Sequence, residues 1–410
     1  MEVQIKQEKA FVPIKKNISL LVSSSALSNM ADAIYTLCVS WYVLDRTGSA
    51  FLTSAIAAIT FIINVFAGPF IGVLVDRTNP KSAMQKAYIA MAIIGVVLII
   101  SYLLWNDYMV ISVMLMVVIN DVAQSFIFPS RNRMLPGLIG NDRVAVVSGY
   151  LTSASNTATL MGNAMAGLLL SFIGFIGVML THSVFFLLAA LLVSWLTLPN
   201  YEIKKKDRTK EQYWKEFIEG VKVLRGHRAL LALTCMNLGT NIVSIGYLYM
   251  VLLKTQYGAN ASQYGIFEAI GVAVSIITGL FVGKLAKKIK PVILLTLSQF
   301  ISAGCMILFG AGHHLLFAFI LFSIQIIFGM FQSIVFGTLL ITLVPSEFRA
   351  RVDSLVISIS AFMMPLTILI GGYLADHIPI RYIFYVAGAW VMLMGFAPLL
   401  SKEVRQLERI

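Results

Sequence analysis

Charged residues are scarce in this sequence of 410 residues, since Asp, Glu, Lys and Arg together make up only 12% of it. A soluble domain carries about twice that share. Hydrophobic residues make up 59%, and a chain this apolar cannot hide its hydrophobic surface from water. Its solvent must therefore be lipid. About twenty apolar residues cross a bilayer, so the length leaves room for about twelve crossings.

The sequence also lacks the motifs of nucleotide, metal and redox chemistry. It has no Gly-Lys-Ser/Thr phosphate loop and no Cys-x-x-Cys pair, and its five histidines form no ligand-spaced pair on one helix face. Cys38, Cys235 and Cys305 all fall inside apolar runs and are typical of small buried hydrophobic residues. We expect no enzyme activity, no metal and no cofactor, so any uphill work must draw on an ion gradient.

The apolar runs predict an all-α membrane protein with twelve transmembrane helices in two six-helix halves. We expect a first bundle at 1–198, a cytoplasmic linker at 199–228 and a second bundle at 229–410. The twelve expected spans are 18–44, 50–75, 83–104, 109–135, 144–171, 176–198, 229–253, 262–286, 291–311, 314–343, 351–375 and 381–400.

The two halves repeat each other at a spacing of about 210 residues, which indicates a duplicated six-span unit in parallel orientation. The matching positions are Gly72 with Gly283, Pro136 with Pro345, and Gly162 with Gly371. The second half lacks the acid that follows Gly72 in the first half, since Lys287 stands where Asp76 stood.

The linker between the halves begins with a basic, solvated run at 204–208 and continues into an amphipathic segment at 214–224. Its apolar residues recur at helical spacing with charged residues between them. Two interpretations remain open. The helix lies on the cytoplasmic membrane surface, or it packs on the underside of the bundle.

The basic residues predict the orientation of the chain in the membrane. If the N-terminus is cytoplasmic, only Arg46, Lys254 and Arg381 of the 31 Lys and Arg residues face outward. This asymmetry is the positive-inside rule, and it places both termini in the cytoplasm of a cell whose plasma membrane holds the protein. The net charge of +12 is split among short loops, which argues against nucleic acid as a partner.

A short charged turn between the second and third spans reads Gly72-Val73-Leu74-Val75-Asp76-Arg77-Thr78-Asn79-Pro80-Lys81. Asn79-Pro80 favours a turn, and Lys81 is expected to anchor the next helix in the headgroup region. The pattern Gly-x-Leu-x-Asp-Arg-x-x-x-Lys resembles the signature loop of the major facilitator superfamily. The segment from Phe128 to Pro136 also resembles its twelve-span efflux branch, which includes macrolide-efflux proteins and siderophore exporters. That resemblance implies a bacterial transporter.

Three acids lie inside expected spans and are the candidates for proton coupling: Asp32, Asp121 and Glu268. An ionised carboxylate at the middle of a bilayer costs about 2.5–3.5 kcal/mol on insertion scales, so such a residue is a functional candidate. A carboxyl group in a medium of low dielectric favours its protonated form. The alternative interpretation is that each acid makes a structural hydrogen bond between helices.

Polar and aromatic residues near these acids at helical spacing are the candidates for binding cargo on a path between the halves. They are Asn29, Tyr35, Thr36, Gln124, Phe128, Asn237, Asn241 and Phe267. For any single aromatic residue, packing in the core is the alternative interpretation.

The charged loops are candidates for gating. Asp76 is placed to accept hydrogen bonds from the start of the eleventh span, near Arg349 and Arg351, if the halves meet on the cytoplasmic side. That contact would hold the transporter open to the outside. The resemblance implies that Lys81 pairs with an acid at the end of the fourth span, where Asp142 is the nearest acid. Gly72, Arg77 and these residues complete the expected gate.

We therefore expect a monomeric transporter that exports a drug-like or amphiphilic small organic molecule in exchange for protons. Three alternatives use the same observations: a lipid or lysolipid transporter, an uptake symporter, and a membrane sensor or scaffold that transports nothing.

Overall fold

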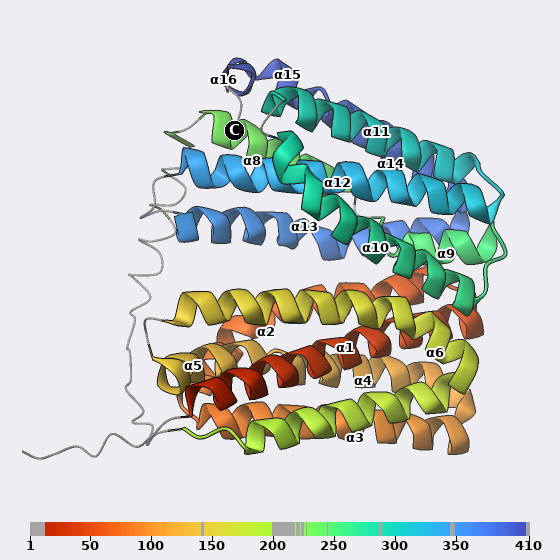
Figure 1. Cartoon of the computed structure of the whole chain (residues 1–410). Helices are drawn as coiled ribbons and strands as arrows, with labels where there is room; N and C mark the ends of the chain where they lie inside the picture. The colour runs from red at the N-terminus through yellow and green to blue at the C-terminus, as the bar shows by residue number, and fades with distance from the viewer. Residues whose placement is uncertain are drawn as a thin grey trace, which may run out of the picture. The chain divides into compact units, whose positions relative to one another are not determined.

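A computed structural model describes residues 13–140, 143–198, 228–243, 245–286, 289–344 and 349–406, with residues 218, 222, 225 and 226 between them. The described residues form helices and no strands (Figure 1). The helices are α1 Ile14–Thr47, α2 Ala50–Asp76, α3 Pro80–Leu104, η1 Asn106–Tyr108, α4 Met109–Gln124, α5 Ile127–Ile139, α6 Val144–Ser194, α8 Arg228–Asn241, α9 Leu248–Thr255, α10 Ala261–Ala286, α11 Pro291–Ala311, α12 Leu315–Leu343, α13 Arg349–His377, α14 Ile380–Met394, α15 Ala397–Leu400 and α16 Lys402–Arg405.

Each expected span falls on one or two of these helices. The fourth span is divided between α4 and α5, which a short break at 125–126 separates. The fifth and sixth spans both lie in α6, which contains a kink at Gly174, where φ is 66°. Glycine adopts this left-handed conformation without the strain that a side chain would add.

By length and hydropathy, seven helical segments among the described residues qualify as membrane spans. One of these segments is the 51-residue α6, which is long enough to cross twice. The all-helical, membrane-spanning class expected from the sequence is therefore confirmed. The count of twelve crossings stays a prediction.

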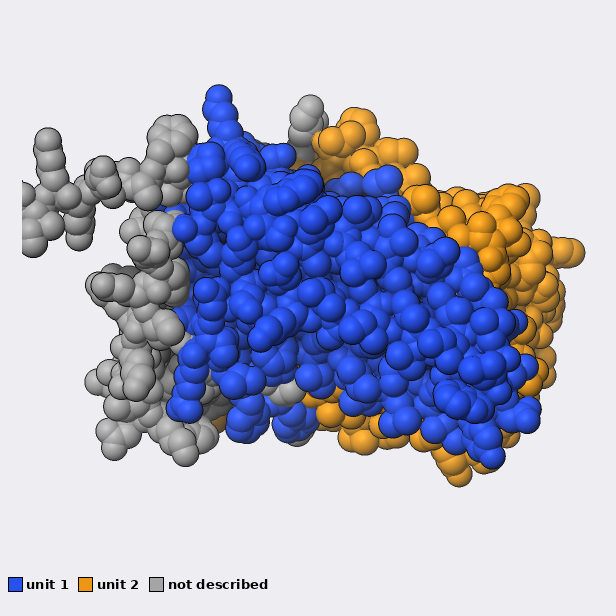
Figure 2. Space-filling model, turned by 90° about the horizontal axis from the view of Figure 1, so that it is seen from below, with its two compact units in different colours: residues 1–36, 66–162, 176–206 blue, residues 37–65, 163–175, 207–410 orange. Residues whose placement is uncertain are grey.

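The chain divides into two compact units, which Figure 2 colours separately. Unit 1 comprises residues 1–36, 66–162 and 176–206, and unit 2 comprises residues 37–65, 163–175 and 207–410. The division cuts through α1, α2 and α6, so it differs from the boundary between the sequence halves. The reason is that one end of each of these three helices packs on helices of the second half. The expected division into two sequence halves stays a prediction.

The core of unit 1 is apolar and joins α1, α3, α5 and α6. Tyr88 and Phe186 are fully buried there, and their ring centroids lie 5.8 Å apart. Met84, Met91 and Met134 fill the space around them. Unbranched methionine side chains adapt to the irregular gaps between helices.

The core of unit 2 is built on α11, which lies beside α12 and α14 (Figure 1). Stacked rings fill one part of it: the centroids of Phe267 and Phe322 are 3.8 Å apart, and Phe309 meets Phe267 edge-on at 6.0 Å. Tyr249 joins this cluster, and its hydroxyl donates to Oε1 of Gln325 at 2.6 Å.

The start of α3 shows how the sequence Asn79-Pro80-Lys81 ends one helix and begins the next. Oδ1 of Asn79 accepts from the backbone N–H groups of Lys81 at 3.0 Å and Ser82 at 3.3 Å. Pro80 occupies the first helical position, where its missing N–H group leaves no hydrogen bond unmade. The helix therefore begins three residues before the expected span.

Helix α6 approaches α1 closely at Gly162. A Cβ atom at this position would lie 2.7 Å from the carbonyl oxygen of Met30 and 2.9 Å from Cβ of Ala33. We expect Gly162→Val to lower the stability of the protein by about 1–3 kcal/mol through overpacking. Thermal unfolding of the purified protein in detergent measures this loss.

Gly149→Val is the matched control on the same helix, because no described atom lies within 4 Å of a Cβ atom built there. Equal losses for the two variants would contradict the close approach at Gly162.

Candidate functional site

Asp32 lies in the middle of α1 with its side chain partly exposed. Its Oδ1 accepts a hydrogen bond of 3.0 Å from Nδ2 of Asn120 on α4. No residue in the described part of the chain forms an ion pair with Asp32. The carboxyl group therefore has one neutral hydrogen-bond donor and no counter-ion in the described part of the chain.

A row of polar side chains continues from Asp32 along α1. One helical turn away, Nδ2 of Asn29 donates to Oγ of Ser155 on α6 at 3.2 Å. A further turn along, Oγ of Ser25 accepts from the guanidinium of Arg131 on α5 at 3.3 Å. The α1 face thus meets α4, α6 and α5 in turn through polar contacts.

Phe128 is the most exposed of the predicted cargo residues in this unit, with 62% of its surface accessible. The guanidinium of Arg131 lies 5.4 Å from the centre of its ring. A cation over an aromatic face is held by the quadrupole of the ring. Thr36, one turn beyond Asp32 on α1, is also partly exposed.

Two other predicted residues of unit 1, Asp121 and Tyr35, are buried in the bundle, and Gln124 is partly buried. Asp121 is 8% exposed, and the ring of Tyr35 is 1% exposed and lies 4.7 Å from the ring of His182. Oε1 of Gln124 is buried and has no hydrogen-bond partner among the described residues. Tyr35 therefore differs from the expectation, because its ring is part of the core and offers no surface to cargo.

In unit 2, Glu268 lies on α10 and is partly exposed. Its Oε1 accepts from the hydroxyl of Tyr264 at 2.9 Å. Phe267, the next residue, is fully buried among Phe309 and Phe322, so it also differs from the expectation of a cargo-binding ring. The helix turns these two neighbouring side chains to different faces.

Asn237 and Asn241 occupy successive turns of α8, and both are partly exposed. Their spacing of four residues puts them on one face of that helix. They remain candidates for polar contacts with cargo.

Much of the expected gate lies outside the described residues. This holds for Asp142 and for the side chains of Asp76, Arg349 and Arg351. Arg77 is exposed. Gly72 is also part of the expected gate, and no described atom lies within 4 Å of a Cβ atom built on it.

Lys81 has a different role from the expected pairing with an acid. Its Nζ donates to the carbonyl oxygens of Ser194 and Leu196, both at 2.8 Å. These carbonyls lie at the end of α6, where backbone acceptors have no partner within the helix. The end of α5 offers no acid, so Lys81 binds the negative end of the α6 dipole.

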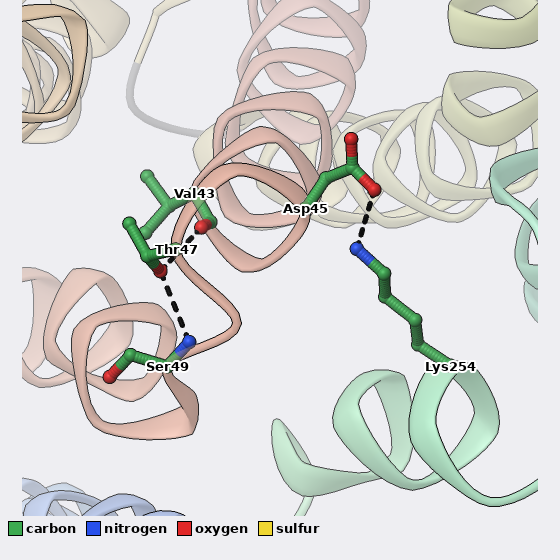
Figure 3. A network of polar contacts seen from close by, with 5 residues as sticks. All are labelled: Val43, Asp45, Thr47, Ser49 and Lys254. Atoms are coloured by element: carbon green, nitrogen blue, oxygen red, sulfur yellow. Dashed lines mark hydrogen bonds and ion pairs between the residues drawn. The ribbon is translucent and has the colours of Figure 1, made fainter. Parts of the chain in front are cut away.

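A polar network surrounds the turn between α1 and α2 (Figure 3). Oδ1 of Asp45 accepts from Nζ of Lys254 on α9 at 2.5 Å. Oγ1 of Thr47 donates to the carbonyl of Val43 at 2.7 Å and accepts from the backbone N–H of Ser49 at 3.1 Å. Lys254 also lies over the ring of Trp41 at 5.4 Å. All these residues belong to unit 2.

Asp376, near the end of α13, binds the start of α2. Its Oδ2 accepts from the hydroxyl of Ser49 at 2.6 Å and from the N–H of Phe51 at 3.2 Å. Its Oδ1 accepts from the N–H of Ala50 at 2.5 Å, while Oγ of Ser49 accepts from the N–H of Leu52 at 3.1 Å. The first three N–H groups of α2 are thereby satisfied.

The sequence profile of the Major Facilitator Superfamily matches residues 21–344. The chain belongs to the Major Facilitator Superfamily. It is therefore a multi-pass membrane transporter of a small-molecule substrate and not an enzyme.

Macrolide efflux protein A of Streptococcus pyogenes is 26% identical over 394 residues, which cover 94% of this chain and 96% of that protein. Among solved structures, the nucleoside transporter NupG has a TM-score of 0.73 at 12% identity and covers 93% of this chain and 98% of its own. A bacterial homologue of the human lysosomal transporter Spinster has a TM-score of 0.72 at 14% identity. The match covers 97% of this chain and 98% of the homologue. These two structures share the major facilitator fold with this chain.

Two contacts of this superfamily member were missed by reasoning from the sequence. Asn120 precedes Asp121 in the chain, and its polarity inside an apolar run was the available signal. Asp376 follows a Gly-x-Leu-x motif that also precedes Asp76. This repeat within the sequence could have indicated that Asp376 makes a functional contact.

Lys81 provides a test of the α3–α6 contact. We expect Lys81→Met to lower stability by about 1–3 kcal/mol, because two charge-assisted hydrogen bonds to carbonyls are lost. Thermal unfolding in detergent measures the loss. Lys86→Met is the control, since this amine is exposed on the same helix; an equal effect of both substitutions would refute the role of Lys81.

Proposed function

We propose that the protein is a proton-coupled exporter of a drug-like or amphiphilic small organic molecule that works by alternating access. Relatives named macrolide efflux protein A, from Streptococcus pyogenes and Enterococcus faecalis, support export of a bulky organic cargo. The match to the first of these runs along 94% of the chain, so it includes the residues of both units.

The observation that carries the proposal is the environment of Asp32. This carboxyl group lies halfway along α1, which the sequence predicts to be the first span; it is partly exposed and accepts a hydrogen bond from the amide of Asn120. A neutral donor stabilises the carboxylate without fixing it as a salt bridge would. Asp32 can therefore take up and release a proton as its surroundings change between the two sides of the membrane.

The cargo surface in unit 1 comprises the partly exposed residues beside Asp32, namely Asn29, Thr36 and Phe128. In unit 2, Asn237 and Asn241 supply polar groups, and Glu268 assists in proton coupling. A cargo with one cationic or hydrogen-bonding group and a large apolar part matches this combination of a carboxyl, amides and an exposed ring.

Transport in vesicles tests the assignment of Asp32. Protein in vesicles is supplied with a labelled macrolide, and accumulation is followed with and without an imposed pH gradient. We expect Asp32→Asn to abolish gradient-driven accumulation, because the amide cannot exchange a proton. Exchange of labelled for unlabelled macrolide without a gradient should persist, since it needs only alternating access.

The matched control is Asp107→Asn, which neutralises an exposed acid of η1. Gradient-driven accumulation by Asp32→Asn at the wild-type rate would overturn the coupling assignment. Flipping of a labelled lipid in the absence of macrolide transport would favour the lipid transporter, and accumulation along the proton gradient would favour the uptake symporter.

A further inference from the structure

The signature motif of the loop after α2 occurs a second time in the chain, at the end of α13. Gly372, Leu374, Asp376 and Arg381 stand 300 positions after Gly72, Leu74, Asp76 and Lys81. The spacing Gly-x-Leu-x-Asp followed five residues later by a basic residue is identical in both places. This repeat is separate from the duplication of the six-span halves, which has a spacing of about 210 residues.

The two copies lie at opposite sides of the membrane in the proposed topology. The second span runs toward the cytoplasm and the eleventh span runs away from it, so Asp76 is cytoplasmic and Asp376 is outside. The first motif ends α2 on the cytoplasmic side, where α13 begins. The second motif ends α13 on the outer side, where α2 begins. Asp376 is therefore expected on the same side of the membrane as the start of α2.

The outer contact is formed in this structure. The carboxylate of Asp376 binds the hydroxyl of Ser49 and the N–H groups of Ala50 and Phe51, as described above. A carboxylate at a helix N-terminus satisfies backbone donors and also interacts favourably with the helix dipole.

The glycine of the second motif is in close contact as well. A Cβ atom built on Gly372 would lie 2.7 Å from Cβ of Ser54 and 3.0 Å from the carbonyl oxygen of Ala50. Deeper along the same two helices, Ala57 and Ala58 pack against Ile368. Gly72, in the first motif, has no described atom within 4 Å of its Cβ position.

We propose that Asp376 and Ser49 form the lock that closes the outer side of the transporter, as the counterpart of Asp76 on the cytoplasmic side. We name this contact the outer lock. Each of the two helices thus ends in a copy of the same motif. The proposal rests on the alternating access of the proposed function, but it needs neither a proton nor a particular cargo.

The nearby ion pair contributes less to the closure than the outer lock. Asp45 is 67% exposed and Lys254 is 24% exposed, and exposed pairs of this kind are weak because water and salt screen them. Asp376 is exposed as well, but it accepts from three donors, and two of them are helix N–H groups that have no other partner in the described residues.

Labelling of a buried cysteine from outside tests the outer lock. The reporter is Ser54→Cys in a chain whose native cysteines are replaced, because Ser54 is 1% exposed beside Gly372. Intact cells are treated with a membrane-impermeant maleimide. We expect Asp376→Ala to raise the labelling rate about 3- to 30-fold, the effect of losing one helix cap. Asp376→Asn should raise it less, since asparagine also caps helices.

Two further variants separate the lock from general loosening. Asp107→Ala, an exposed acid of η1, should leave the rate unchanged. Asp76→Ala should lower the rate, because the contact expected of Asp76 from the sequence would favour the state open to the outside. A second reporter, Ser183→Cys, lies in the core of unit 1 and should stay unlabelled in every variant.

Three results would overturn the proposal: an unchanged rate in Asp376→Ala, a change in the same direction for Asp76→Ala and Asp376→Ala, or labelling of Ser183→Cys in Asp376→Ala. The assay contains no macrolide and no pH gradient. It can therefore fail while Asp32 still couples protons, and it can succeed when the vesicle experiment on Asp32 fails.

Discussion

A polar group that leaves water for a lipid-embedded bundle loses free energy unless it finds a partner within the protein. The described contacts follow this constraint at three kinds of site. Asp32 in mid-helix takes the amide of Asn120, Lys81 takes the last carbonyls of α6, and Asp376 takes the first N–H groups of α2. Two of these sites are helix termini, where backbone groups are left unpaired by the helix itself. The need to pair polar groups therefore influences which helices pack together. It also decides which contacts must break before two helices can separate.

Where no polar partner is required, close contact between helices depends on small residues. Gly167 of α6 lies so close to α10 that a Cβ atom there would be 2.6 Å from Cα of Gly265. Lipid is as apolar as leucine, so helices in a membrane gain stability from close packing. The contact between Gly372 and Ser54 is of the same kind, and the Asp376 cap fixes its position along α2. Packing and capping thus act on the same pair of helices.

The sequence predicted the class, most helix positions and the place of Asp32 in the interior of a helix, because hydropathy patterns require little knowledge of tertiary contacts. It did not predict that Asn120 binds Asp32, since this depends on how α4 is rotated about its axis. It also did not distinguish Phe267 from Phe128: both are aromatic residues in apolar runs, and only packing decides that one is buried and the other exposed. Asp376 was within reach of the sequence, but a comparison of the two halves at a spacing of about 210 residues does not align it with Asp76.

The boundary between the compact units crosses α1, α2 and α6 inside the helices rather than in loops. As long as Asp376 holds the start of α2, any displacement of one unit against the other must therefore be absorbed by bending these three helices. The sequence places a weak point at one of these boundaries: unit 1 ends at Gly162 of α6, and glycine has a low helix propensity. A displacement of the units before Asp376 releases α2 would therefore store elastic strain in these three helices.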